Sequence, residues 1–122
     1  MIDHVSIQCE DLTASLAFYD AALAPLGAKR VMEVGVAVGY GIDRPQFWLG
    51  PVSTGEQSRE IHLAFAAPSR AAVVAFFEAA VAAGAEVLHV PGDHPEYHPG
   101  YYGAFVRDPD GNNVEAVSHL SA

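Results

Sequence analysis

An internal repeat constrains this chain more than any other feature of its sequence. Residues 2–27, IDHVSIQCEDLTASLAFYDAALAPLG, align with residues 60–85, EIHLAFAAPSRAAVVAFFEAAVAAGA. His4 then falls on His62, and a pair of aromatic residues followed by an acid recurs further along both copies. Such a repeat predicts two copies of one supersecondary unit, and overlooking it would misassign the whole fold.

Each copy has the pattern of a strand, a helix and three further strands. Asp11 and Ser69 are expected N-caps, and Gly27 and Gly84 suit the left-handed position after a helix. Short β-prone segments follow each helix, at residues 29–34, 36–42 and 46–50 and at residues 85–90, 101–107 and 112–118. The sequence therefore predicts an α+β fold of two βαβββ modules: module one at 1–51, a linker at 52–59 and module two at 60–120.

The composition indicates how many domains the chain forms and which partners and location suit it. With 122 residues, of which 51% are hydrophobic, the chain fits one domain. A net charge of -9, from 6 basic and 15 acidic residues, argues against nucleic acids and acidic membranes as partners. No apolar run approaches the roughly 20 residues of a membrane span, and the N-terminus lacks a signal-peptide pattern. One cysteine, Cys9, excludes an intrachain disulfide and favours a cytoplasmic location.

Polar residues share one face of the first strand. In MIDHVSIQ, Val5 and Ile7 alternate with His4, Ser6 and Gln8. His62 likewise stands on the face of EIHLAFA opposite its apolar residues. If each apolar face packs against its own helix, both histidines point away from the helices. Two modules related by an approximate twofold can then place these faces opposite each other around one cavity.

A third candidate ligand follows a tight turn near the end of the chain. In RDPDGNNVEAV, proline and glycine favour a turn, and Glu115 lies in the middle of the next strand. A mid-strand acid is costly unless it is paired, solvated or metal-bound. Each of His4, His62 and Glu115 alone is commonly a hydrogen-bonded or surface side chain. Together, two histidines and a carboxylate predict a metal site with open coordination positions.

These segments resemble the vicinal oxygen chelate superfamily, which includes glyoxalase I, fosfomycin resistance enzymes, extradiol dioxygenases and bleomycin resistance proteins. The resemblance rests on IDHVSIQCEDLTASLAFY, HLAFAAPSRAAVVAFF and FVRDPDGNNVEAV, and runs from about residue 2 to residue 118. It implies an eight-stranded, incomplete barrel around one divalent metal ion. The implied ligands are His4, His62 and Glu115, a set that suits Zn, Ni, Mn or Fe(II).

The sequence departs from each named branch of this superfamily. Glyoxalase I enzymes commonly have a further carboxylate on the fourth strand, where QFWLG presents Trp48, so a strict glyoxalase I activity is not favoured. Fosfomycin enzymes have a substrate-binding tyrosine where this chain has Phe105. Extradiol dioxygenases need an acid/base histidine, for which His98 is the nearest candidate, although a surface histidine in a Pro-rich loop is an equal interpretation.

The resemblance and the strand pattern together predict a site and two alternative functions. The expected substrate-binding residues are Trp48, Tyr101, Phe105, Ser6, Gln8 and Tyr40, with His98 and Tyr101 as catalytic candidates. The first hypothesis is a metal-dependent lyase, isomerase or dioxygenase that chelates vicinal oxygens of an unidentified small molecule. The alternative is a non-catalytic small-molecule or drug-binding protein of bleomycin-resistance type.

Dimerisation is expected, because a second copy commonly closes the open side of such cups. Whether the modules pair within one chain or across two chains stays open from the sequence. If they cross, the expectation is that His62 comes from a different subunit than His4 and Glu115.

Overall fold

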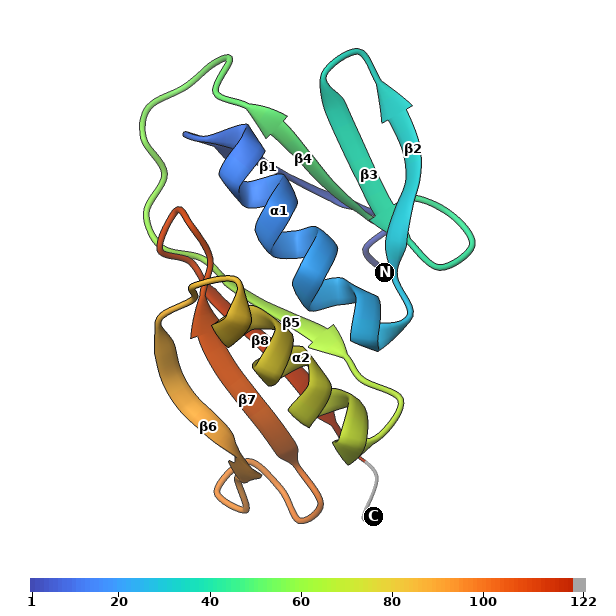
Figure 1. The fold of residues 1–122 in the computed structure, drawn as a ribbon, viewed down its shortest axis with the longest axis vertical. Coiled ribbons are helices and arrows are strands. Elements are labelled where there is room, and N and C mark those ends of the chain that lie inside the picture. Colours follow the sequence, from blue (N-terminus) through green and yellow to red (C-terminus); the bar gives the residue numbers. More distant parts are fainter. Residues whose placement is uncertain (120–122) are drawn as a thin grey trace.

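Both modules fold as a strand, a helix and three strands, in a computed structural model that describes residues 1–119 (Figure 1). Module one comprises β1 (Val5–Cys9), α1 (Leu12–Leu23), a 3₁₀ turn η1 (Ala24–Leu26), β2 (Lys29–Val34), β3 (Ala37–Gly41) and β4 (Phe47–Pro51). Module two comprises β5 (His62–Ala66), α2 (Arg70–Ala82), β6 (Val87–Asp93), β7 (Tyr102–Arg107) and β8 (Asn113–Ser118). The predicted α+β fold of two βαβββ modules is confirmed.

The helices begin and end where local chemistry sets their limits. The Asp11 side chain accepts a hydrogen bond from a backbone amide of the first turn of α1, and Ser69 does the same for α2. Gly27 and Gly84 follow the helices with φ of 88° and 92°, which favours glycine. α1 itself stops at Leu23, because the chain continues as the short 3₁₀ turn that contains a proline.

The two sheets have the same internal order. Module one has the strand order β1-β4-β3-β2, and module two has β5-β8-β7-β6. In each sheet the first strand pairs in parallel with the last strand of its module, and the other pairings are antiparallel. Within residues 1–119 the sheets are separate and do not close into a barrel. The first strand of each module is therefore an edge strand.

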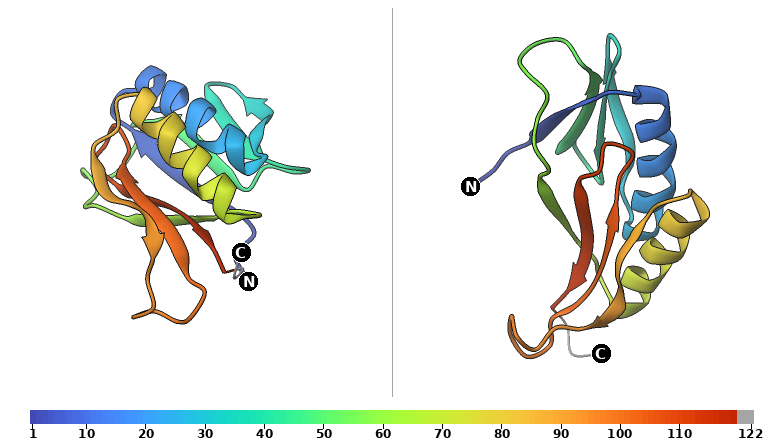
Figure 2. Two further views of the ribbon diagram at one scale, coloured as in Figure 1. Left: turned by 60° about the horizontal axis from the view of Figure 1, so that its bottom comes forward. Right: turned by 90° about the vertical axis from the view of Figure 1, so that its left-hand side faces the viewer.

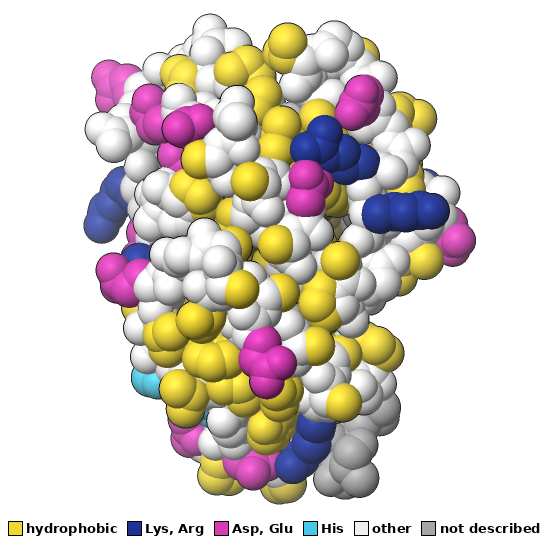
Figure 3. Space-filling view, in the orientation of Figure 1, with side chains coloured by type: hydrophobic (Ala, Val, Ile, Leu, Met, Phe, Trp, Pro, Cys, Tyr) yellow, Lys and Arg dark blue, Asp and Glu magenta, His cyan; other side chains and the backbone are white. Residues whose placement is uncertain are grey.

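The helices α1 and α2 lie side by side and cover the same side of both sheets (Figure 2). Aromatic residues fill the core between the layers and join the modules: the ring centroids of Tyr19 and Phe47 lie 4.9 Å apart, and those of Phe47 and Phe65 lie 5.2 Å apart. On the helix side, apolar side chains gather over module two and histidine shows only at its edge (Figure 3). The opposite faces of the sheets carry no helix within the described residues.

The DPDG turn before β8 also fastens the modules to each other. The Tyr19 hydroxyl of α1 donates to Asp108 Oδ2 at 2.7 Å, and both residues are buried. The Glu10 amide donates to Asp110 Oδ1 at 3.1 Å. Burial, and next the Asp108 carboxylate, raise the pKa of Tyr19 above its usual range, so its hydroxyl remains a donor.

The linker lies between β4, which ends at Pro51, and β5, which begins at His62. The side chain of Gln8 anchors the first residues of the linker, because Gln8 Oε1 accepts hydrogen bonds from the backbone amides of Ser53 and Thr54 at 2.7 and 3.1 Å. The predicted end of module two, residue 120, lies outside the described residues. Among residues 1–119, neither helix is long and apolar enough to cross a membrane.

Candidate functional site

A histidine and a carboxylate meet on the uncovered face of module two. His62 begins β5, and Glu115 lies in the middle of the neighbouring strand β8. His62 Nε2 lies 2.7 Å from Glu115 Oε1. The Glu115 side chain is 1% exposed, whereas that of His62 is 52% exposed. The pair therefore places one imidazole nitrogen next to one carboxylate, and solvent reaches the pair through the half-exposed His62. Both groups are ordinary ligands of divalent metals.

Tyr101, just before β7, holds the second oxygen of the same carboxylate. Its hydroxyl donates a hydrogen bond to Glu115 Oε2. Burial, followed by the Glu115 carboxylate, raises the pKa of Tyr101, so the phenol keeps its proton and orients the acid. Gly103 makes room for this contact, because a Cβ there would stand 3.2 Å from Glu115 Oε2 and 3.4 Å from the Tyr101 ring.

Phe105 forms the buried wall beside this pair. It is the cross-strand partner of both Glu115 and His89. The imidazoles of His62, His89 and His94 surround its ring, with centroids 6.0, 5.3 and 5.3 Å away. His89 and His94 were not predicted from the sequence. The alternation of residues in β6 was the available signal for His89, because it puts that side chain on the same face as Phe105.

His98, the loop candidate for acid/base catalysis, pairs with another histidine instead of with Glu115. His98 Nε2 lies 2.8 Å from His119 Nδ1, and His98 Nδ1 donates to the Pro99 carbonyl at 2.7 Å. The His98 ring also packs on Tyr101 with centroids 5.4 Å apart. Tyr101 thus stands between this histidine pair and Glu115. His119 was missed because it follows the last strand, where no periodicity marks it.

His4, the third expected ligand, lies in module one and does not reach the pair on module two. It precedes β1, its side chain is 55% exposed, and its Nδ1 lies 2.9 Å from Asp3 Oδ1. Within residues 1–119, no three His, Cys, Asp or Glu side chains form a group that could hold a metal ion. One chain therefore does not bring His4, His62 and Glu115 together, and the metal site predicted from the sequence stays a prediction. The two uncovered sheet faces lie beside each other and do not face one another (Figure 2).

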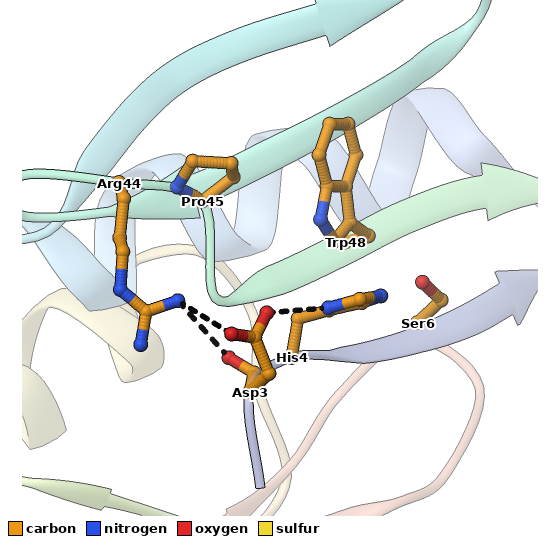
Figure 4. Close-up of a pocket in the computed structure, with 6 residues that line it drawn as sticks. All are labelled: Asp3, His4, Ser6, Arg44, Pro45 and Trp48. Carbon is orange, nitrogen blue, oxygen red and sulfur yellow. Dashed lines mark hydrogen bonds and ion pairs between the residues drawn. The ribbon is translucent and has the colours of Figure 1, made fainter.

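His4 instead borders a cavity of about 430 Å³ on module one (Figure 4). The cavity is lined by Asp3, His4, Ser6, Arg44, Pro45 and Trp48. Trp48 of β4 lies between Ser6 of β1 and Gly39 of β3 in the sheet register, on the face that carries His4. Trp48 and Ser6 thus lie together as expected. Arg44 was missed, because a loop residue follows no strand or helix periodicity.

Two further residues expected in the cavity serve other contacts. Gln8 is engaged with the linker, as described above. Tyr40 lies in the core on the helix side of β3, where its hydroxyl donates to Asp20 Oδ1 at 2.7 Å. The expectation that Tyr40 lines the same cavity as Trp48 is not met. Strand alternation explains this, since Gly39 faces Trp48 and its neighbour Tyr40 must face the other way.

Comparison with known proteins gives one consistent result. The family model of the Glyoxalase/Bleomycin resistance protein/Dioxygenase superfamily matches residues 1–116. No curated protein matches the chain. A glyoxalase/bleomycin resistance protein from Albidiferax ferrireducens T118 is similar in structure, with a TM-score of 0.83, 30% identity, and 94% of this chain and 96% of that chain covered.

Two other solved structures share the fold at lower identity. A glyoxalase/bleomycin resistance protein/dioxygenase family enzyme from Burkholderia phytofirmans PsJN has a TM-score of 0.71 and 19% identity, and 98% of each chain is covered. A lactoylglutathione lyase from Agrobacterium tumefaciens has a TM-score of 0.68 and 24% identity, with 97% of this chain and 92% of that chain covered. At these identities the likeness concerns the fold.

Proposed function

The chain belongs to the glyoxalase/bleomycin resistance protein/dioxygenase superfamily, and from this premise we propose that it is a divalent-metal-dependent enzyme acting on a small molecule. The observation that carries the proposal is the His62–Glu115 pair, in which an imidazole nitrogen lies 2.7 Å from a buried carboxylate oxygen. Two such donors converging on an uncovered sheet face are two thirds of the ligand set that the sequence predicts. A bound metal ion would hold two neighbouring substrate oxygens and stabilise negative charge on them.

We assign the third ligand, His4, to a second copy of the chain. Both helices cover the same side of the two sheets, so the faces with His4 and with His62 and Glu115 lie beside each other in one chain (Figure 2). A twofold dimer with these faces together would oppose module one of each copy to module two of the other. His62 and Glu115 would then belong to the same subunit. This revises the expectation that His62 joins His4 and Glu115 from the other subunit.

The residues around Glu115 suit this function. Tyr101 keeps its proton and fixes one carboxylate oxygen, which orients the other toward His62. Phe105 excludes water from the wall behind the pair. The donor set fits Zn, Ni, Mn or Fe(II), and the reaction is of lyase, isomerase or dioxygenase type. A reducing cytoplasm suits a chain whose one cysteine, Cys9, is free and buried.

Metal analysis of untagged protein tests the proposal. Wild-type protein is expected to retain one divalent ion per chain, and the variants His4→Ala and Glu115→Gln are expected to lose it. His119→Ala is the matched control, since His119 is bonded to His98 and not to Glu115. Melting temperatures of all variants confirm that each still folds. Equal metal content in the wild type and both site variants would contradict the proposal.

Co-expression of the two site variants tests whether the site is shared between chains. A heterodimer combines His4 from the Glu115→Gln chain with His62 and Glu115 from the His4→Ala chain, and so contains one intact site. Random twofold pairing makes half of the dimers mixed, so about a quarter of the wild-type metal content should return. No recovery would show that the ligands come from one chain.

A non-catalytic small-molecule-binding protein is the second candidate, and one observation favours it. Glu115 already has partners for both carboxylate oxygens, His62 and Tyr101, so the buried acid is satisfied without a metal. On this alternative, the Glu115→Gln variant binds small molecules as the wild type does. Ligand binding that persists in the metal-free protein, together with no metal in the wild type, would favour this second function.

A further inference from the structure

The cavity beside His4 is held in shape by glycines that allow close packing. A Cβ at Gly39 would stand 2.8 Å from Pro45 Cβ and 3.0 Å from the Trp48 indole. At Gly41 a Cβ would stand 1.8 Å from the Arg44 carbonyl oxygen. The loop from Ile42 to Pro45 therefore lies directly on β3, which fixes Arg44 and Trp48 as opposite walls of the cavity (Figure 4).

The guanidinium of Arg44 is loosely held in this cavity. Its contacts with protein within residues 1–119 come from Nη1, which lies 3.4 Å from both the Asp3 carbonyl and Asp3 Oδ2. Arg30, on the same module, forms by contrast a two-pronged ion pair with Asp20 at 2.9 and 2.7 Å. Arg44 thus retains donor capacity for a ligand, in the geometry that matches a planar carboxylate.

The donors of Arg44 favour a planar carboxylate over a phosphate. Asp3 lies between His4 and Arg44, 2.9 Å from the imidazole and 3.4 Å from the guanidinium. Arg44 is the one arginine or lysine of the lining and stands beside this acid. A dianionic, tetrahedral phosphate would meet too little positive charge here, whereas a planar carboxylate with a single charge matches the two-pronged guanidinium. The Trp48 indole provides a flat apolar surface for the remainder of the ligand.

We propose that this cavity binds the carboxylate of a small organic acid through Arg44, with the apolar body of the acid against Trp48. The inference rests on the proposed function, because it names an organic acid as the substrate class of that site. Arg44 is then the residue that selects anions over neutral molecules of the same shape. The cavity lies on module one alone, so it is present whether or not a metal is bound.

Trp48, the one tryptophan in the sequence, provides a direct test, since its indole N–H gives a single resonance in a ¹⁵N-labelled sample. Metal-free protein is titrated with isovalerate, with its neutral amide isovaleramide, and with isobutylphosphonate. Isovalerate is expected to shift the indole resonance to saturation and to bind at least about tenfold more tightly than the amide. The phosphonate is expected to bind more weakly than isovalerate.

Two variants make the test specific. Arg44→Gln should reduce isovalerate binding to that of the amide, while Arg59→Gln, which removes an exposed arginine of the linker, should leave it unchanged. An unaltered indole resonance in ligand-free Arg44→Gln shows that the cavity is intact. The proposal is overturned if isovalerate and isovaleramide bind equally, or if Arg44→Gln still binds isovalerate tightly. The assignment to a carboxylate is overturned if isobutylphosphonate binds more tightly than isovalerate. Because no metal is present, these outcomes are independent of the metal analysis above.

Discussion

The hydrogen bond from Tyr19 to Asp108 is expected to contribute substantially to stability, and Tyr19→Phe removes it alone. The bond is 2.7 Å long, and Tyr19 and Asp108 are 0% and 5% exposed. Asp108 Oδ1 still accepts from the Asp110 and Asn112 amides, and Oδ2 from the Asn112 side chain, so the substitution leaves no orphaned charge. A hydrogen bond to a charged group is worth about 1.5–3 kcal/mol, so we expect a loss of about 2 kcal/mol.

Urea unfolding followed by circular dichroism measures this loss. With a slope of about 2 kcal/mol per molar urea, the midpoint should fall by about 1 M while the slope stays constant. The melting temperature should fall by about 8 °C, from about 4 °C per kcal/mol for a chain of this size. Tyr102→Phe is the control, because that half-buried ring packs against the Arg70 guanidinium at 4.7 Å and stays in place.

The pH dependence gives a second check on the same bond. Burial and then Asp108 raise the pKa of Tyr19, so its contribution is complete below the unfolded tyrosine pKa of about 10 and is lost as the pH rises further. The difference between wild type and Tyr19→Phe should therefore be constant near neutrality and shrink in strong alkali. The reasoning is refuted if Tyr19→Phe is no less stable than Tyr102→Phe.

Three further outcomes follow from the contacts described above. Gly41→Ala should lower the free energy of unfolding by about 1–3 kcal/mol in urea, because the new Cβ would stand 1.8 Å from the Arg44 carbonyl oxygen. Gly50→Ala is its control: the new Cβ there has open space around it, so the free energy of unfolding should change by less than about 0.5 kcal/mol. Cys9 is buried, and burial raises the pKa of its thiol. Ellman's reagent should therefore modify Cys9 only as fast as the protein unfolds, and an immediate reaction of the folded protein would contradict this. Burial opposes ionisation of Asp20, but hydrogen bonds from Arg30 and Tyr40 outweigh burial and lower the pKa of Asp20. The wild type should therefore be more stable than Asp20→Asn above about pH 4, and this difference should disappear when the two are unfolded at progressively lower pH.

Local structure followed from the sequence because its causes are local. The caps at Asp11 and Ser69 and the left-handed glycines Gly27 and Gly84 depend on side chains within a few residues. Strand alternation likewise assigned Trp48 to the face of His4. The same rule applied to Tyr40 would have excluded it from the cavity, since adjacent residues of β3 point to opposite sides of the sheet.

The arrangement of the modules could not be predicted in the same way. The repeat shows that His4 and His62 occupy corresponding positions in the two modules. It does not determine how the two modules pack against each other. That depends on which faces the helices α1 and α2 share and on long-range contacts such as the bond from Tyr19 to Asp108. Arg44 and His119 lie outside the periodic elements, so no pattern marked them.

The division of the candidate ligands between two sheets has a physical consequence for any metal site they form. Glu115 is buried but satisfied by His62 and Tyr101, so a single copy can fold without a metal. On the proposed dimer, the donor set would be completed only when the His4 of another copy approaches, so metal affinity would be linked to dimerisation and each would strengthen the other. Dilution below the dimer dissociation constant should then release metal and subunits together, and metal retained by a dilute monomer would refute a shared site.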